Sequence, residues 1–133
     1  IFISSLKESF LNKVKSMKLE ENFIFIHPTE YISKYYNLFD VFILPSFYEG
    51  LGVVCIEAQT NGLPCLVSEF VPSEVICNSN AFKLKLCPKL WAEKIIKFQN
   101  FQHNYSQRFK YSDILLTKFS REVFINKFNL IYE

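Results

Sequence analysis

Short apolar runs alternate along this chain with longer segments in which apolar residues recur every three or four positions. The runs indicate buried strands, and the three-to-four spacing indicates amphipathic helices. Strands that alternate with helices of this kind are typical of βαβ units. The pattern therefore predicts an α/β fold, a Rossmann-like, doubly wound parallel sheet.

The predicted strands and helices follow one another with little sequence left over for a second domain. We predict strands at residues 1–3, 23–26, 41–45, 63–67 and 82–86, and helices at residues 6–18, 29–39, 52–61, from Pro88 to about Phe98, and across Phe124, Phe128 and Ile131. Thr29 is expected to cap the second helix, and Gly62 to follow the third as its C′ residue. We therefore expect residues 1–133 to form one domain. Because the chain starts inside a predicted strand, we also expect it to be a piece of a longer protein.

The composition fits a globular domain. Half of the 133 residues are hydrophobic, which argues against disorder, and no apolar run reaches the roughly 20 residues that span a bilayer. The four cysteines, Cys55, Cys65, Cys77 and Cys87, form no C-x-x-C pair and have no histidine spacing suited to zinc. Reduced thiols in a cytoplasmic protein are therefore expected.

The net charge of +2 conceals an asymmetry between the two parts of the chain. Residues 1–82 carry five lysines and nine acids, whereas residues 83–133 carry ten basic residues and four acids. The basic part could rest peripherally on an anionic membrane surface. It could equally be a solvated lysine-rich face, because the positive residues are spread out. Nothing in this distribution indicates a nucleic-acid partner.

The candidate chemistry lies between residues 45 and 59, directly after a predicted buried strand. Gly50 and Gly52 precede a predicted helix, whose first turn presents unpaired N–H groups to an anion. A residue without a Cβ also lets a phosphate approach the backbone. Glu49 and Glu57 would repel a diphosphate, so they are better explained as acceptors for hydroxyl groups. A diphosphate between two hydroxyl-bearing rings is a nucleotide sugar.

This segment resembles the E-x7-E signature of retaining glycosyltransferases of family 4, which have the GT-B fold. Glu49 and Glu57 would be its two acids, and the following Glu57-Ala58-Gln59 and Gly62-Leu63-Pro64 are similar to the family's EAxxxGxP run. Bacterial capsular and exopolysaccharide transferases are the most similar group. The resemblance implies that this chain is the donor-binding, C-terminal half of a two-domain enzyme, which transfers a sugar to a glycan or lipid-linked acceptor without a metal ion or other cofactor.

The resemblance also implies a role for each residue of the loop. Glu49 would act on the hydroxyls of the donor sugar and is the catalytic candidate, and Glu57 would accept from the ribose. The donor site would consist of Ser46, Glu49, Gly50, Leu51, Gly52, Val53 and Glu57, with backbone amides on the diphosphate. Without a nucleotide sugar, Glu49 would be an ordinary exposed loop acid and Glu57 a solvated helix residue.

Some positions depart from the family pattern or stay open. Ser4-Ser5 stands where the family has a glycine-bearing turn, and the expected diphosphate-binding Arg and Lys would come from upstream, as would the acceptor domain. We therefore expect the isolated chain to be inactive. Tyr48 could pack on the sugar, but packing within the protein is the favoured interpretation. A nucleotide-sugar epimerase and a non-catalytic nucleotide-binding module are the alternative functions.

Overall fold

The computed structural model describes residues 1–3, 8–98 and 108, and the chain divides into two compact units, Ile1–Tyr35 and Tyr36–Glu133. Each unit is considered by itself. The predicted helix across Phe124, Phe128 and Ile131 lies outside the described residues. Whether the two units form the single domain expected from the sequence therefore stays a prediction.

The first unit is built around a short pair of parallel strands. Its elements are β1 (Phe2–Ile3), α1 (Glu8–Ser16), a 3-10 turn η1 (Glu20–Asn22) and β2 (Phe25–Ile26), and β1 pairs in parallel with β2. The ring of Phe10 on α1 meets Phe23 and Phe25 edge-on, with centroids 6.1 Å apart in both pairs. The spacing of Leu6, Phe10, Val14 and Met17 predicts one inward-facing stripe on the predicted helix, and Val14 is buried as that stripe requires. Met17 lies beyond the end of the helix and is 56% exposed, so its inclusion in that stripe was wrong.

The second unit contains a parallel sheet of three strands in the order β3-β4-β5. Its elements are β3 (Phe42–Leu44), α3 (Val53–Thr60), β4 (Cys65–Ser68), a 3-10 turn η2 (Ser73–Val75), β5 (Ala81–Leu84) and α4 (Pro88–Ile96). Phe42 pairs with Cys65, and Cys65 with Ala81, so that all three strands point the same way. The predicted α/β fold with a parallel sheet is confirmed.

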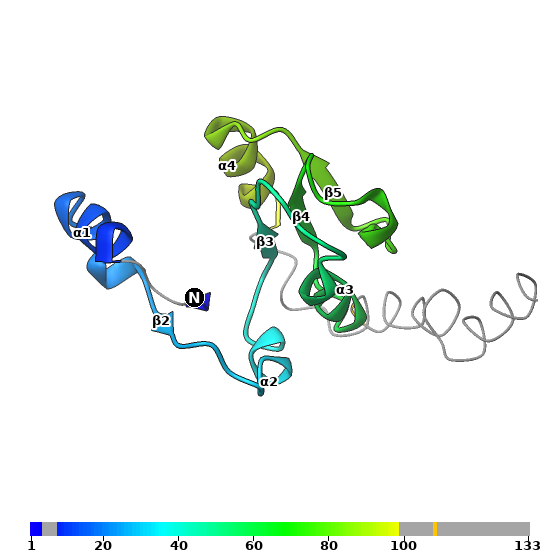
Figure 1. Cartoon of the computed structure of the whole chain (residues 1–133), viewed down its shortest axis with the longest axis horizontal. Helices are drawn as coiled ribbons and strands as arrows, with labels where there is room; N and C mark the ends of the chain where they lie inside the picture. The colour runs from blue at the N-terminus through cyan, green and yellow to red at the C-terminus, as the bar shows by residue number, and fades with distance from the viewer. Residues whose placement is uncertain (4–7, 99–107, 109–133) are drawn as a thin grey trace, which may run out of the picture. The chain divides into compact units, whose positions relative to one another are not determined.

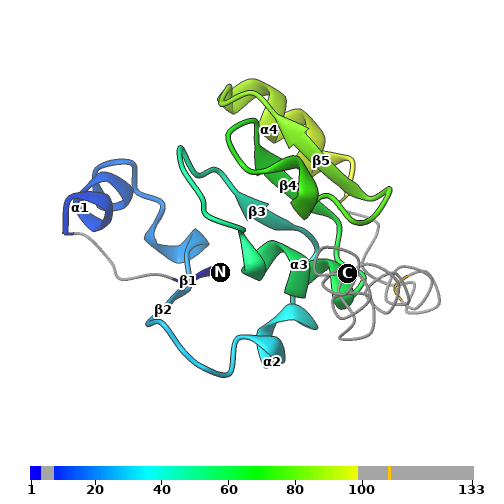
Figure 2. The ribbon, with the colours of Figure 1, turned by 45° about the vertical axis from the view of Figure 1, so that its right-hand side comes forward.

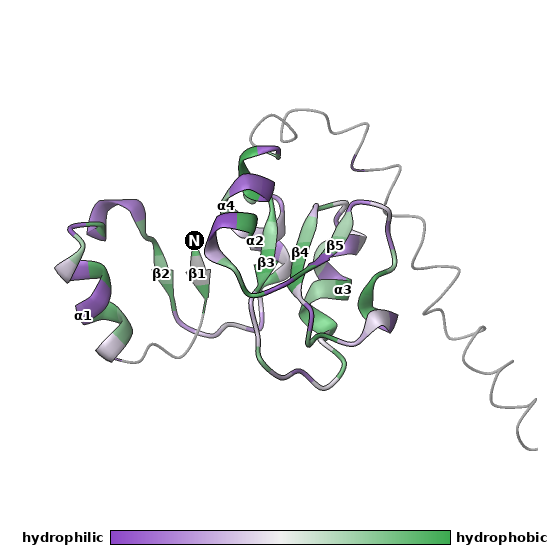
Figure 3. Ribbon diagram, turned by 90° about the horizontal axis from the view of Figure 1, so that it is seen from above, coloured by the Kyte–Doolittle hydropathy of each residue, from purple (hydrophilic) through white to green (hydrophobic). Residues whose placement is uncertain are grey.

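The central strand β4 forms the core of this unit. All four of its residues are buried, and Figure 3 shows the strand mostly in the green of hydrophobic residues. Helices α3 and α4 lie on opposite sides of the three strands in both Figure 1 and Figure 2. This arrangement covers both faces of the sheet, as expected for parallel strands.

Two glycines define the ends of α3. Gly52 is the N-cap residue with a left-handed backbone (φ 66°), and Gly62 is left-handed just beyond the C-terminus (φ 70°). The N–H groups of Gly62 and Leu63 donate to the carbonyls of Gln59 and Ala58, which is the hydrogen-bond pattern of a Schellman motif. The predicted C′ role of Gly62 is confirmed. The helix therefore starts and stops within one residue of the prediction.

The predicted helix at residues 29–39 is shorter in the structure. Only Ser33–Tyr36 (α2) is helical, although the hydroxyl of Thr29 does accept from the N–H of Tyr31. Aromatic residues such as Tyr35 and Tyr36 are weak helix formers. The ring of Tyr36 is instead held by edge contacts with Phe39 and Phe42, each at 6.2 Å, so contacts with β3 replace further helical turns.

Candidate functional site

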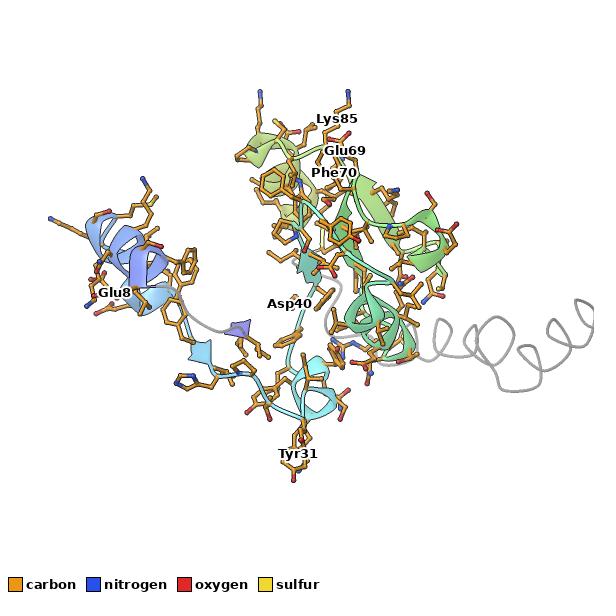
Figure 4. All side chains as sticks on the ribbon, in the orientation of Figure 1. Glu8, Tyr31, Asp40, Glu69, Phe70 and Lys85 are labelled. Atoms are coloured by element: carbon orange, nitrogen blue, oxygen red, sulfur yellow. The ribbon has the colours of Figure 1, made fainter. Side chains whose placement is uncertain are left out.

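The loop of residues 45–52 joins the end of β3 to the start of α3, and it therefore lies at the carboxyl edge of the parallel sheet. The segments that follow β4 and β5 reach the same edge, since the N–H of Glu69 donates to the carbonyl of Leu84 at 2.9 Å. Figure 4 shows Glu69 and Phe70 beside Lys85 at this end. The ring of Phe47 also meets Phe70, with centroids 6.2 Å apart. Ligands of open α/β sheets bind at this edge.

The start of α3 offers hydrogen-bond donors to an anion. The first N–H group that is bonded within the turn is that of Cys55, which donates to the carbonyl of Gly52 at 2.9 Å. Across the described residues, the N–H groups of Val53 and Val54 have no acceptor. The first turn also carries no acidic side chain. These two amides and the helix dipole therefore favour a negative group in front of Gly52.

Glu49 is half-buried and is held by a short chain of hydroxyl groups. The hydroxyl of Ser46 donates to Oε1 of Glu49 at 2.6 Å. The hydroxyl of Ser68, at the end of β4, donates in turn to the carbonyl of Ser46 and accepts from the N–H of Phe70 at 3.3 Å. Ser68 thus caps the loop, and the carboxylate of Glu49 has a fixed direction instead of being a free loop acid.

Glu57 is half-buried on α3 and is held by a different hydroxyl. The hydroxyl of the fully buried Tyr36 lies 2.9 Å from Oε2 of Glu57 and 3.2 Å from the carbonyl of Val54. Burial raises the pKa of Tyr36, and the hydrogen bond to the Glu57 carboxylate raises it further. Tyr36 therefore keeps its proton at neutral pH and remains a donor to Glu57. Among the described residues, no hydrogen-bond donor is found for Oε1 of Glu57, so that oxygen can accept from another donor.

The other predicted loop residues, apart from the buried Gly52, are open to solvent. Leu51 and Val53 are about half-exposed, and a Cβ built on Gly50 would meet nothing within 4 Å. Gly50 is therefore not needed for packing. Tyr48 is 86% exposed, so its interpretation as a packing residue was wrong. The ligand roles of Ser46, Glu49, Gly50, Leu51, Gly52, Val53 and Glu57 stay predictions.

Two side chains around the site were not singled out from the sequence. The helical spacing of Ile32, Tyr36 and Phe39 predicts that Tyr36 faces inward, but it does not predict the bond to Glu57. A buried tyrosine hydroxyl needs a partner, and that need was the available signal. Gln59 was seen only as part of a motif. It is nearly fully buried, and so are Cys55 and Leu63, four residues before and after it. A polar side chain among apolar positions of a predicted helix must find hydrogen-bond partners inside the protein, and that was the available signal.

Other expected features can be compared with the described part of the chain. Its four cysteines are free thiols, and Cys55 and Cys65 are buried. Burial raises the pKa of Cys65, while a hydrogen bond from Cys65 lowers that of Cys55. No three His, Cys, Asp or Glu side chains gather into a metal site within residues 1–3, 8–98 and 108. The helices described there include none that is long and apolar enough to cross a membrane.

Comparison with known proteins identifies the family to which this site belongs. A model of the family described as glycosyl transferases group 1 matches residues 4–114, which include the whole loop and both glutamates. The chain belongs to the glycosyl transferases group 1 family. The GT-B fold expected from the sequence agrees with this family and with the parallel sheet of the second unit.

Several relatives are named for work on glycans. The chain is 35% identical over 88 residues to EpsF of Bacillus subtilis (strain 168), a protein named as a glycosyltransferase; the match covers 64% of this chain and 23% of that relative. It is 38% identical over 72 residues to the amylovoran biosynthesis glycosyltransferase AmsD of Erwinia amylovora, covering 53% and 20%.

A shorter match with higher identity is to an Escherichia coli enzyme, the UDP-Gal:alpha-D-GlcNAc-diphosphoundecaprenol alpha-1,3-galactosyltransferase. It is 59% identical over 29 residues, 22% of this chain and 8% of that enzyme. The three alignments thus span less than a quarter of the relatives' own length.

Proposed function

We propose that the protein to which this chain belongs transfers a sugar from a nucleoside diphosphate donor to an acceptor hydroxyl, with retention of the anomeric configuration. This chain provides the donor site. The observation that carries the proposal is a pair of unpaired helix amides between two carboxylates, each of which is held by its own hydroxyl group. The family match supports the same assignment.

The backbone amides and the carboxylates would bind different parts of the donor. The amides of Val53 and Val54 and the turn at Gly52 would receive the diphosphate, because the helix terminus favours negative charge. Glu57 is four residues further along α3, one turn deeper, and would accept from a ribose hydroxyl. Glu49 is on the loop side of the same amides and would accept from the sugar. Ser46 acts through Glu49, since its hydroxyl fixes that carboxylate.

Catalysis would consist mainly of stabilising the leaving group. Breaking the bond between the sugar and the diphosphate leaves additional negative charge on the phosphate oxygens, and preorganised N–H dipoles stabilise that charge. The remaining neutralisation would come from basic residues upstream of this chain. No metal ion is required in this scheme.

The acceptor and the cellular setting follow from the relatives in part. The E. coli relative is named for a diphosphoundecaprenol-linked acceptor, and AmsD for amylovoran biosynthesis. We propose a glycan or lipid-linked acceptor, used in the synthesis of a capsular, extracellular or other surface polysaccharide on the cytoplasmic side of a membrane. Among the alternatives, the family match favours a transferase over an epimerase, and an intact acceptor domain would distinguish it from a simple nucleotide-binding module.

The test separates the two glutamates in the intact protein. Glu57→Ala should weaken binding of free UDP or GDP by about 1.5–3 kcal/mol, because a charge-assisted hydrogen bond to the ribose is lost. Glu49→Ala should leave this affinity nearly unchanged but reduce sugar transfer, since its proposed partner is the sugar. Calorimetry with each diphosphate and kinetics with the sugar donor measure the two effects.

A matched control for lost negative charge is Glu93→Ala. Glu93 is exposed on α4 and is not part of the loop between β3 and α3, so its removal should change neither measurement. The assignment of roles is wrong if Glu49→Ala and Glu57→Ala lower UDP and GDP affinity equally, or if neither variant differs from Glu93→Ala.

A further inference from the structure

Gln59 lies in the second half of α3 and has only 1% of its surface exposed. Its amide nitrogen donates to the carbonyl of Val75 at 2.8 Å and to that of Cys55 at 3.1 Å. Its amide oxygen accepts from the N–H groups of Cys77 at 2.9 Å and Asn78 at 3.1 Å. A glutamine amide has two donors and two acceptor sites, so this side chain is fully used.

These bonds fix the course of the backbone after β4. Three of the four partners are backbone groups of Val75, the last residue of the η2 turn, and of Cys77 and Asn78 just after it. The side chain of Asn78 donates back to the carbonyl of Gln59 at 3.1 Å. The side chain at position 59 must therefore donate to the carbonyl of Val75 and accept from the N–H groups of Cys77 and Asn78 at the same time. Methionine would satisfy neither, and glutamate would set a carboxylate against the carbonyl of Val75.

The segment that Gln59 holds also supports the turn in front of α3. Val71 and Val75 are almost completely buried. A Cβ built on Gly52 would lie 3.5 Å from Cγ2 of Val75 and 3.6 Å from Cγ1 of Val71. The methyl groups of both valines therefore cover the side of Gly52, the residue that aims the first N–H groups of α3.

We propose that Gln59 is a positioning residue for the diphosphate, acting through Val75 on the Gly52 turn. The chain of contacts runs from the Gln59 amide to the Val75 backbone, and from the Val75 side chain to Gly52. Gln59 itself would not contact the donor. This inference rests on the proposed function for the identity of the ligand, but the mechanical link between Gln59 and Gly52 does not.

The experiment uses the intact protein and two variants that break different steps. Gln59→Met removes all four hydrogen bonds with little change of volume. Val75→Ala leaves the Gln59 bonds in place and removes the methyl groups that cover Gly52. Trp91→Phe is the control, because it also removes one inward hydrogen bond, from Nε1 to the carbonyl of Lys85 at 2.9 Å, but does so on α4.

Two readouts are compared at matched temperatures below each variant's unfolding transition. The first is the Kd for UDP and for GDP. We expect it to rise about fivefold in Gln59→Met and in Val75→Ala, because misaimed amides lose part of their charge-assisted hydrogen bonds. The second, which needs no ligand, is hydrogen exchange of the Cys55 amide, whose bond to the Gly52 carbonyl reports on the turn. We expect it to accelerate in both variants and not in Trp91→Phe.

Each outcome decides the proposal. It is overturned if Gln59→Met keeps the parental Kd and Cys55 exchange, or if Trp91→Phe changes them equally. If Gln59→Met does not fold, Val75→Ala decides in the same way. If the parent binds neither UDP nor GDP, the proposed function fails. In that case the exchange of the Cys55 amide still tests the link between Gln59 and Gly52: faster exchange in Gln59→Met and Val75→Ala supports the link, and unchanged exchange overturns it.

Discussion

Replacing Tyr36 with phenylalanine tests how the protein holds the deeper of its two carboxylates. The substitution removes one hydroxyl, which lies 2.9 Å from Oε2 of Glu57 and 3.2 Å from the carbonyl of Val54, and leaves the ring contacts with Phe39 and Phe42 in place. The change is therefore confined to a hydrogen bond and creates almost no cavity.

The size of the effect follows from the groups involved. A hydrogen bond to a charged group contributes about 1.5–3 kcal/mol when its partner is left unsatisfied. Glu57 is only half-buried, so water can replace the lost donor at the carboxylate, and the lower end of that range applies. We expect Tyr36→Phe to lower the free energy of unfolding by about 1.5 kcal/mol. Urea titration of the intact protein, followed by circular dichroism, measures this value.

The same variant should affect the nucleotide less than Glu57→Ala does. Without Tyr36 the Glu57 carboxylate is still present but is no longer fixed, so a ribose bond forms at an added cost in side-chain entropy. We expect UDP or GDP to bind about threefold more weakly, a fraction of the loss from removing a charge-assisted bond. The reasoning is refuted if the variant is as stable as the parent, or if it loses as much affinity as Glu57→Ala.

Three further predictions concern backbone, pH and charge. Gly52→Ala should cost about 1–2 kcal/mol in urea unfolding, because its φ of 66° strains an alanine, whose Cβ would meet Val71 and Val75 only at ordinary van der Waals distances. Gly62→Ala should cost more, because its Cβ would also clash with the backbone of Arg108, and equal costs would contradict this. The pKa of Tyr36 is raised in the folded state, so the contribution of its hydroxyl to the free energy of unfolding is complete below about pH 10. Above that pH the contribution falls by up to roughly 1.4 kcal/mol per pH unit. The parent should therefore lose more stability than Tyr36→Phe between pH 8 and pH 11 in the same urea titration. If the excess positive charge of residues 83–133 contacts anionic lipid, vesicle binding should fall steeply with added salt, because exposed charges are screened within about 10 Å at 0.1 M; equal binding to neutral vesicles would exclude an electrostatic contact.

The local elements of this fold could be predicted where a residue type has one structural use. Gly62 is required by a left-handed turn, and Pro88 starts α4 at a position where it loses no helical hydrogen bond. The apolar run before Pro45 was correctly predicted as a strand, since such a run bounded by turn residues is typical of a parallel strand. Its predicted burial was wrong, because Ile43 is 46% exposed and no residue of β3 is fully buried.

The contacts that join distant segments could not be predicted in the same way. The bond between Tyr36 and Glu57 spans 21 residues, and that between Gln59 and Asn78 spans 19. Such pairs depend on the register of neighbouring elements, which periodicity does not specify. The sequence therefore identified the loop and its two acids, whereas the groups that hold Glu49 and Glu57 required coordinates.

The hydrogen bonds that connect Ser68, Ser46 and Glu49 matter for any attempt to alter the proposed sugar preference. The hydroxyl of Ser68, at the end of the central strand, donates a hydrogen bond to the carbonyl of Ser46, and the hydroxyl of Ser46 donates to Glu49. The direction of the Glu49 carboxylate therefore depends on a residue in the interior of the sheet. An alanine at position 68 would remove the hydroxyl that holds Ser46 and so alter the direction of Glu49, without changing any residue of the proposed donor loop. Directed evolution toward a different sugar should therefore randomise Ser68 together with the loop of residues 45–52. Changes in the loop alone would leave Ser68 in place, and with it the direction of the Glu49 carboxylate.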